Sequence, residues 1–473
     1  MKAKERRIDL TEGSLLSGML ALAIPVIINS FIQSIYNLTD TFWLGRLGTN
    51  QLAAINLVSP VQNIVQNFGS GLTVAGAVLI SQYVGAKKLK EAKSMANQIY
   101  ACAMIFATTC AVTIALLSPF LVRWLGAEGE TFRHARIYLS LVILDMPFLF
   151  TVNMFQSINQ AQGDTVTPMI LNFLGICINL IADPLLMIVL NWGAAGAALA
   201  TVFAKMVPAI VALTKLTDQE RTIHINFRGL KFEKDKLKNI LIIGFPTALG
   251  GSTMQLGFLL MSKSVYVYGT SAMAAYGVAN KVNGFITLPS NGIGSAVSTI
   301  VGQNIGAKKL DRANKGYHVA MYCSVGFLLL AGFVLSRVTV SEAAVGIFTQ
   351  DPEVISMAGD FLRVMAFWCF ANGVYNSTMG LFQGSGHTEV TMLVDASRLW
   401  IFRFATLFVC ENILHMGLRS VWYSVVVSNG ISAVILFMVY LTGYWKKPRM
   451  SASETRKAKA AKIVYSEDNK DED

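Results

Sequence analysis

Long apolar segments recur along the whole chain, and they restrict its fold more than any other feature. Twelve can be marked, each long enough for the about 20 residues that a helix needs to cross a bilayer. They lie near 15–45, 52–82, 95–121, 137–161, 166–190, 193–214, 237–263, 275–304, 316–337, 356–382, 389–411 and 417–443. Because lipid offers no hydrogen-bond partner, a spanning backbone must satisfy itself. The sequence therefore predicts an all-α integral membrane protein with twelve transmembrane helices.

The composition agrees with a membrane location. Only 14% of residues are charged, against about 25% in soluble domains, and 53% are hydrophobic. The net charge of +11 could suggest nucleic acid, but the basic residues lie in loops and tails, so we expect none as a partner. The six cysteines lie within apolar segments and form no CxxC pair, so neither a disulfide framework nor a zinc site is expected.

Lysine and arginine concentrate in alternate connections, which predicts the orientation. They gather in the amino-terminal tail, the central linker, the carboxy-terminal tail and the loops after 52–82 and 275–304. By the positive-inside rule, both termini should be cytoplasmic, in a plasma (inner) membrane. The predicted parts are a cytoplasmic tail (1–14), an N-lobe of six helices (15–214), a cytoplasmic linker (215–236), a C-lobe of six helices (237–443) and a charged cytoplasmic tail (444–473).

The two halves of the chain repeat each other. A shift of 221 residues places Pro25 on Pro246 and Gln82 on Gln303. The same shift, with no gap, matches Gly48-Thr49 to Gly269-Thr270, Gly71 to Gly292, Gly85-Ala86-Lys87-Lys88-Leu89 to Gly306-Ala307-Lys308-Lys309-Leu310, and Gln162-Gly163 to Gln383-Gly384. Six helices per repeat give both halves one orientation, related by an axis along the membrane normal. We expect substrate between pseudo-symmetric lobes and alternating access, with a channel as the open alternative.

A polar stripe on segment 15–45 ends in an acid. Asp40 follows Tyr36, Gln33 and Asn29 at spacings that put all four on one helix face. Ionisable residues deep in the membrane are costly and are functional candidates by default. The stripe should face protein or a water-filled cavity; hydrogen bonding between helices is the alternative for its amides.

Segment 166–190 carries the second acid. Asn179 lies one turn before Asp183, and Pro184 follows, so the carbonyl of Leu180 loses its helical partner. These oxygen atoms suit Na⁺, or a hydrogen-bonded pocket for a proton; a satisfied helix break is the alternative reading. Pro25 should free a carbonyl in the same way, so both prolines are candidate gating positions, with a static kink as the alternative.

The second repeat lacks this chemistry. The stripe residues fall on Gly250, Met254, Gly257 and Met261, and at a shift of 223 Asn179 and Asp183 fall on Phe402 and Thr406. Ion coupling is therefore expected in the first half. Other charged residues lie nearer the predicted helix ends, where snorkelling or local pairing should explain most of them. They are Asp145, Lys205, Lys263, Lys281, Arg363, Asp395, Arg398 and Arg403, with Arg398 and Arg403 as the leading exceptions.

These motifs, in this order, resemble the multidrug and toxic compound extrusion (MATE) family from about Leu10 to Trp445. The matching elements are Pro25, Asp40-Thr41-Phe42-Trp43-Leu44-Gly45, Gly48-Thr49-x-x-Leu52-Ala53-Ala54, the repeated Gln-x-x-Gly-Ala-Lys-Lys loops, Gln162-Gly163-Asp164-Thr165 and Asn179-x-x-x-Asp183-Pro184. The acids resemble the DinF-like branch; where the NorM-like branch has carboxylates, this chain offers Gln255 and Asn372. The chain departs from the family in Arg403-Phe404-Ala405-Thr406, which lacks a proline.

The resemblance implies an activity and a set of residues. It implies export of amphipathic, often cationic compounds in exchange for Na⁺ or H⁺, with small-molecule substrates and membrane lipid as partners, and neither a cofactor nor an obligatory protein partner. The implied ion-coupling residues, also a candidate Na⁺ site, are Asp40, Asp183, Asn179 and Thr201. The implied residues around substrate are Gln33, Tyr36, Tyr138 and Asn153.

Three rival readings remain open. A lipid-linked saccharide flippase of the same superfamily is the nearest, although extra helices or a strongly cationic cavity are not evident. A major-facilitator transporter would carry Gly-x-x-x-Asp-Arg-x-Gly where this chain has Gly85-Ala86-Lys87-Lys88-Leu89-Lys90. An intramembrane enzyme would need a nucleophile, HExxH or DDxxD motif, and the sequence offers none.

Overall fold

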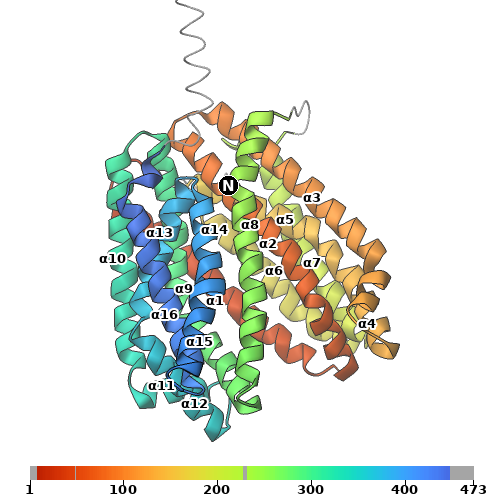
Figure 1. Cartoon of the computed structure of the whole chain (residues 1–473). Coiled ribbons are helices and arrows are strands. Elements are labelled where there is room, and N and C mark those ends of the chain that lie inside the picture. The colour runs from red at the N-terminus through yellow and green to blue at the C-terminus, as the bar shows by residue number, and fades with distance from the viewer. Residues whose placement is uncertain (1–7, 48, 227–231, 448–473) are drawn as a thin grey trace, which may run out of the picture.

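The computed structural model describes residues 8–47, 49–226 and 232–447, and every regular element in these ranges is helical (Figure 1). The first half contains α1 (Leu15–Leu44), α2 (Thr49–Gly85), α3 (Leu89–Trp124), α4 (Gly129–Val142), α5 (Met146–Ala161), α6 (Val166–Pro184) and α7 (Gly193–Thr217), with a 3₁₀ turn at Ile143–Asp145 and a π-helix at Leu185–Val189. The predicted features at Gly48 and in residues 1–7, 227–231 and 448–473 lie outside the described residues.

The second half repeats this order with nine α-helices in place of seven. It contains α8 (Lys234–Tyr266), α9 (Thr270–Gly306), α10 (Leu310–Leu335), α11 (Val338–Gly346), α12 (Pro352–Ala366), α13 (Cys369–Gly384), α14 (Thr388–Ser397), α15 (Phe404–Asn412) and α16 (Arg419–Leu441). A π-helix at Arg398–Arg403 joins α14 to α15, and a 3₁₀ turn at Tyr444–Lys446 follows α16. The short helix α11 was not expected from the sequence.

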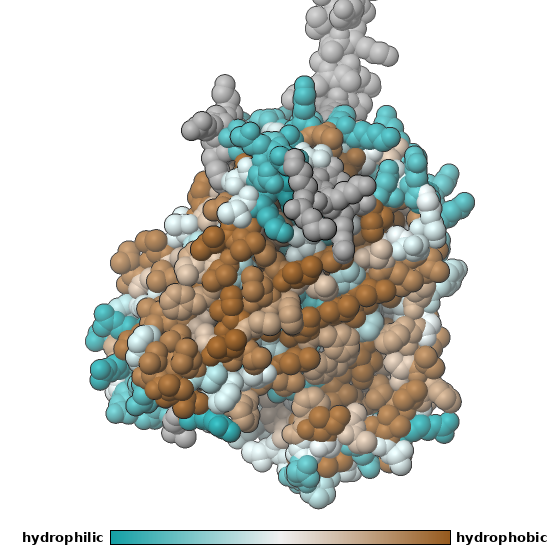
Figure 2. Space-filling view, turned by 180° about the vertical axis from the view of Figure 1, so that it is seen from behind, coloured by the Kyte–Doolittle hydropathy of each residue, from teal (hydrophilic) through white to brown (hydrophobic). Residues whose placement is uncertain are grey.

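The surface carries an apolar belt between two polar faces, as an integral membrane protein requires (Figure 2). Within the described residues, nine helices are long and apolar enough to cross a membrane, and the bent pair α12–α13 makes ten. The helix α9 and the run α14–α15 lie where the sequence predicts the two remaining spans, although neither meets this test of length and hydropathy.

The repeat is real, but its register changes. Helices α2 and α9 differ by 221 residues at both ends, whereas α5 and α13 differ by 223. The expectation of a gapless repeat is therefore wrong, because two residues are inserted in the second half before α12. The left-handed glycines after α5 and α13, Gly163 and Gly386, confirm the larger shift, with φ of 86° at each. The structural partner of Gln160 is thus Gln383, and matching Gln162-Gly163 to Gln383-Gly384 is out of register.

The halves meet tightly at one face of the molecule. We call it the linker face, because the linker between α7 and α8 lies there with residue 8 and the start of α1. Gln82 Nε2 donates to the Gly384 carbonyl at 3.0 Å, and Gln303 Nε2 donates to the Ala161 carbonyl at 2.8 Å. A Cβ atom on Gly85 would collide with the Gln303 carbonyl oxygen, and one on Gly306 with that of Gln82. Nearer the opposite face, a Cβ on Gly277 or Gly284 would have no neighbour within 4 Å.

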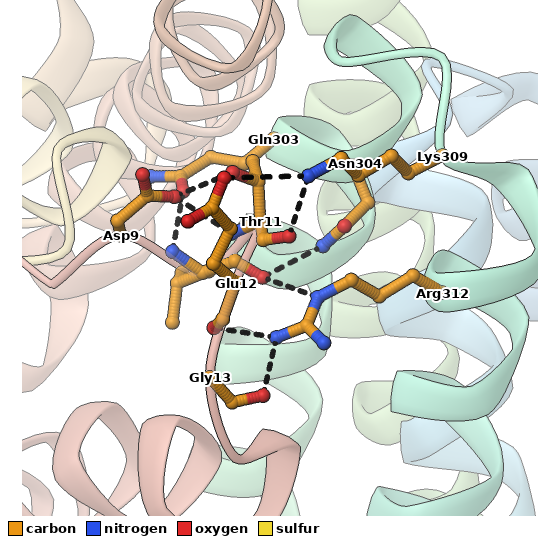
Figure 3. Close-up of polar contacts among 9 residues, drawn as sticks. Asp9, Thr11, Glu12, Gly13, Gln303, Asn304, Lys309 and Arg312 are labelled. Carbon is orange, nitrogen blue, oxygen red and sulfur yellow. Dashed lines mark hydrogen bonds and ion pairs between the residues drawn. The ribbon is translucent and has the colours of Figure 1, made fainter.

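Residues 8–13 form an N-terminal strap across the linker face (Figure 3). Arg312 Nε donates to the Leu10 carbonyl at 3.1 Å, and Arg312 Nη2 donates to the carbonyls of Glu12 and Gly13 at 2.6 and 2.9 Å. The Leu10 amide donates to Gln303 Oε1 at 3.3 Å. The strap also packs against Gly163 of the first half, because a Cβ there would lie 2.6 Å from the Ile8 carbonyl oxygen. It therefore touches both halves where they are closed.

Candidate functional site

The last turns of α6 place an amide and a carboxylate side by side. Asn179 and Asp183 are each only 1% exposed, and Asn179 Nδ2 donates to Asp183 Oδ1 at 3.2 Å. Asn179 Oδ1 is buried and receives no hydrogen bond from the described residues. Directly after Pro184 the chain continues as a π-helix, since proline cannot donate the N–H that would continue the α-helical ladder. The site thus offers a buried oxygen without a donor.

Asp40 reaches the same place from α1. Its carboxyl group approaches that of Asp183 closely enough for a hydrogen bond between them. Two ionised carboxylates at that separation would repel each other strongly, so a proton or a cation is needed between them. The two acids and Asn179 therefore bring several side-chain oxygen atoms together between α1 and α6.

Two tyrosines surround the acid pair. The buried Tyr138 on α4 and the half-buried Tyr36 on α1 both lie within electrostatic range of Asp40 and Asp183. Their hydroxyl groups can donate to a carboxylate or accept from a proton-bearing one. Tyr36 and Tyr138 therefore lie near the two acids, and their part in binding substrate stays a prediction.

The remaining residues implied by resemblance are not joined to this pair by any hydrogen bond in the described structure. Thr201 lies on α7, which packs against α6, and its hydroxyl donates to the Ala197 carbonyl at 3.0 Å, which leaves its lone pairs free. Gln33 Nε2 makes a 3.5 Å contact with Asn37 Oδ1 on its own helix. Asn153 lines a separate cavity between the halves.

Asp145 lies near the same two tyrosines as Asp40 and Asp183, a position that the sequence analysis did not predict. It was expected near a helix end, but the chain bends at the 3₁₀ turn between α4 and α5, and the side chain is 1% exposed. Its Oδ1 has no hydrogen-bond partner among the described residues, and Lys205 of α7 lies within electrostatic range. The charge of Asp145 also acts on Tyr36 and Tyr138. Snorkelling does not explain the buried Asp145 and its neighbour Lys205. The sequence feature that could have indicated this position is a carboxylate two residues before Pro147 in an apolar segment.

The second half holds a buried charged cluster of its own. Arg398 Nη2 bonds Asp395 Oδ1 at 3.0 Å, and the Tyr375 hydroxyl donates to the same oxygen. Arg403 is 4% exposed, and Nε donates to Ser428 Oγ at 3.1 Å. Asp395 is buried and paired with Arg398 three residues later, so local pairing, one of the two explanations expected from the sequence, accounts for it and snorkelling does not. A functional role for Arg398 and Arg403 stays a prediction. The π-helix at Arg398–Arg403 contains both arginines and forms without a proline. The chain therefore departs from α-helical geometry here even though it lacks the proline of the family.

A cavity of about 430 Å³ lies between the halves. It is framed by two helices of each half, α2 with α5 and α9 with α13, which are partners in the repeat. Its polar lining consists of amides and hydroxyls, and none of its lining residues is charged. The polar residues are Ser70, Thr73, Asn153, Gln156, Gln160, Asn291, Ser295, Ser298, Asn376 and Gln383.

Pro25 lies beside this cavity. It is buried inside α1, which continues through it, and it lines a smaller cavity with Asn29, Gln156 and Gln160. Asn29 Oδ1 is buried without a hydrogen-bond donor among the described residues. The proline is therefore placed between the central cavity and the polar stripe that leads to Asp40.

The described part of the chain holds no group of three or more His, Cys, Asp or Glu side chains able to bind a metal ion. Two carboxylates and an amide oxygen form a hard donor set, which suits Na⁺ or a proton better than a transition metal.

Taken together, two repeated helical halves, a polar cavity between them and buried acids in one half define a polytopic secondary-transporter fold. A model of the MatE family matches residues 25–185 and 246–409. The chain therefore belongs to the MatE family, the extrusion family whose motifs it resembles.

Individual relatives agree over nearly the full length. The probable multidrug resistance protein NorM of Thermotoga maritima is 24% identical over 436 residues, covering 91% of this chain and 93% of NorM. The multidrug export protein MepA of Staphylococcus aureus is 25% identical over 429 residues, covering 90% and 93%. Among solved structures, an outward-facing multidrug resistance MATE transporter of the MOP superfamily superimposes with a TM-score of 0.87 at 23% identity, covering 96% of this chain and all of that one.

Proposed function

We propose that the protein is a secondary active antiporter that exports amphipathic, often cationic organic compounds in exchange for Na⁺ or H⁺. The observation that carries this proposal is the close approach of Asp40 and Asp183 beside the free oxygen of Asn179, inside an apolar belt. The names of the multidrug relatives support the substrate class. The absence of matching acids in the second repeat supports the DinF-like branch.

The coupling follows from the placement of the acids on different helices. A bound Na⁺ or proton lowers the charge of the pair from −2 to −1 and bridges α1 to α6, whereas its loss leaves two repelling carboxylates. Because α1 also packs against α9 of the second half, movement of α1 changes the space between the halves. Pro25 and Pro184 are the positions where α1 and α6 can bend, and Thr201, Gln33 and Asn153 belong to the proposed site by resemblance.

The linker face is proposed to be cytoplasmic, with both termini on that side. The basic residues near it, which include Lys87, Lys88, Lys308 and Lys309, support this orientation. The two halves then act as the predicted lobes, 15–214 and 237–443, that rock about the cavity.

The test is ethidium transport in proteoliposomes under an imposed Na⁺ gradient and then a pH gradient. Wild type is compared with Asp40→Asn and Asp183→Asn, which keep side-chain size and remove the charge. A matched control is Asp360→Asn, a partly exposed acid outside the proposed site that is paired with Arg419 at 3.0 Å. We expect one gradient to drive transport, both membrane substitutions to abolish it in folded protein, and the control to retain it.

Two results would change the proposal. Equal transport by the membrane variants would remove the two acids from the coupling site. If wild type moves no dye under either gradient, drug export fails, and translocation of a lipid-linked saccharide is the reading to test next.

A further inference from the structure

We infer that the central cavity is a subsite for an uncharged, hydrogen-bonding group of the substrate, such as a hydroxylated head group. This rests on the proposed function, because it assigns one part of an exported compound to one place. At about 430 Å³ the cavity has the size of a small-ligand pocket. Its chemistry separates it from the acid cluster of α1 and α6.

Three amides on the cavity wall are free. Asn153, Asn291 and Gln383 line the cavity, and their side chains make no hydrogen bond within the described residues. Asn291 is exposed, and Asn153 and Gln383 are half-buried, so all three amides are accessible to a molecule that enters the cavity. Each free amide offers two donors and one acceptor oxygen, which is what a hydroxyl-bearing group needs.

The repeat places these amides in pairs. At the shift of 223, Asn153 corresponds to Asn376 and Gln160 to Gln383. In each pair one amide is anchored, because Gln160 Nε2 donates to Ser295 Oγ at 2.8 Å and Asn376 Nδ2 donates to Ser290 Oγ at 3.0 Å. The other member of each pair is free. Each half therefore contributes to the same cavity one amide that is hydrogen-bonded and one amide that is not.

The cavity lacks the charge that an ionic group would need. No charged residue lines it, and the lipid around the helices keeps the surroundings poorly polarisable. Moving an ion there without a counter-charge costs far more than moving a hydroxyl group, which the amides can satisfy. The acids are also distant along the helices: Asp183 follows the start of α6 at the linker face by 17 residues, about 26 Å, whereas Gln160 lies one residue from the linker-face end of α5.

A molecule bound in the central cavity would also affect the packing of α1. Gln156 and Gln160 line both the central cavity and the smaller cavity beneath Pro25. Gln156 Oε1 accepts from Asn172 Nδ2 at 3.4 Å on the side of the smaller cavity. A group that turns these glutamines therefore changes the packing at the bend of α1.

The test is equilibrium binding to purified full-length protein in nanodiscs, without an ion gradient. The probes are a short alkyl glucoside with a neutral fluorophore, read by anisotropy, and ethidium. The variants Gln383→Met and Asn291→Leu remove free amides without breaking a hydrogen bond of the fold. Met379→Gln adds an amide where the first half has Gln156. The matched control is Asn412→Leu, an exposed amide outside the cavity.

The expected result is selective. Each lost hydrogen bond should weaken glucoside binding about fivefold, and the double variant about 20-fold, with ethidium changed less than about twofold. Met379→Gln should keep or raise glucoside affinity, and the control should match wild type. Unchanged glucoside binding in the double variant, or an equal loss of both probes, would overturn the subsite. Failure of ion-driven ethidium transport would instead count against the antiporter proposal, so the two can fail separately.

Discussion

Gln82 and Gln303 occupy the same place in the two repeats and make the same bond in opposite directions. Gln82 of α2 donates to the last residue of α13, and Gln303 of α9 donates to the last residue of α5, at 3.0 and 2.8 Å. Each glutamine therefore ties its own half to the other half. With the glycine contacts one turn later, these bonds hold the linker face closed, and the repeated Gln-x-x-Gly motif acquires a structural role.

Loss of both cross-half bonds should open the linker face. In Gln82→Leu/Gln303→Leu we expect the closed state to lose about 3 kcal/mol, from three buried hydrogen bonds, since Gln303 Oε1 also accepts from the Leu10 amide. The measurement is the labelling rate of a cysteine placed at Ser298, in a background free of native cysteines, with a reagent added from the linker face. Gln162→Leu is the matched control, because Gln162 donates to Ile158 within one helix at 3.0 Å. Equal labelling in both variants would deny the glutamines a gating role.

The glycines at this face should tolerate no side chain. Gly85→Ala or Gly306→Ala puts a methyl group against a carbonyl oxygen of the other half, and overpacking of this kind costs about 1–3 kcal/mol. We expect a lower Tm in detergent for each. Gly326→Ala in α10 meets open space, so it should keep or raise the Tm, since alanine favours helix. A Tm for Gly85→Ala at or above that of wild type would contradict the packing described.

The buried Asp395–Arg398 pair should be costly to break on one side only. Asp395→Asn leaves the guanidinium of Arg398 buried without its counter-charge, for which about 3–5 kcal/mol of destabilisation is expected. The double variant Asp395→Asn/Arg398→Met removes both charges and should recover part of that loss. Thermal unfolding of Asp395→Asn, Arg398→Met and the double variant measures the coupling free energy between the two charges. Additive losses would show that the charges do not interact.

The N-terminal strap should respond to acid in a defined direction. The Thr11 hydroxyl donates to Asp9 at 2.6 Å, and this hydrogen bond holds the pKa of the Asp9 carboxyl below its ordinary 3.8. A lowered folded-state pKa stabilises the strap above the ordinary value and loses that effect as the pH falls through the folded pKa. Hydrogen–deuterium exchange of residues 8–13 should stay protected down to about pH 4 and rise below it.

Thr11→Val tests the cause of this pH response. Without the hydroxyl donor, the pKa of Asp9 should return toward its ordinary value, so protection at neutral pH should be lower than in wild type and should fall less on acidification. Identical pH profiles would assign the protection of the strap to the Arg312 contacts alone.

Sequence alone reached the class of the protein because its signals are local or periodic. The twelve predicted spans follow from apolar length, and the twofold organisation from glycines and glutamines matched at a shift of 221 residues, which becomes 223 at α5 and α13. Asn179 and Asp183 could be placed side by side, since residues four apart share a helix face. Pro184 could be identified as a break because the lost N–H is a property of the residue itself.

Only the tertiary structure decided which distant residues meet. It brought Asp40 of α1 near Asp183 of α6, and it placed the buried Asp145, at the 3₁₀ turn between α4 and α5, within electrostatic range of the same two tyrosines. It also moved the repeat register by two residues, which set Gln160 opposite Gln383 in an uncharged cavity. Periodicity fixes the face of a helix on which a residue lies, whereas the packing of helices against one another decides what that face meets.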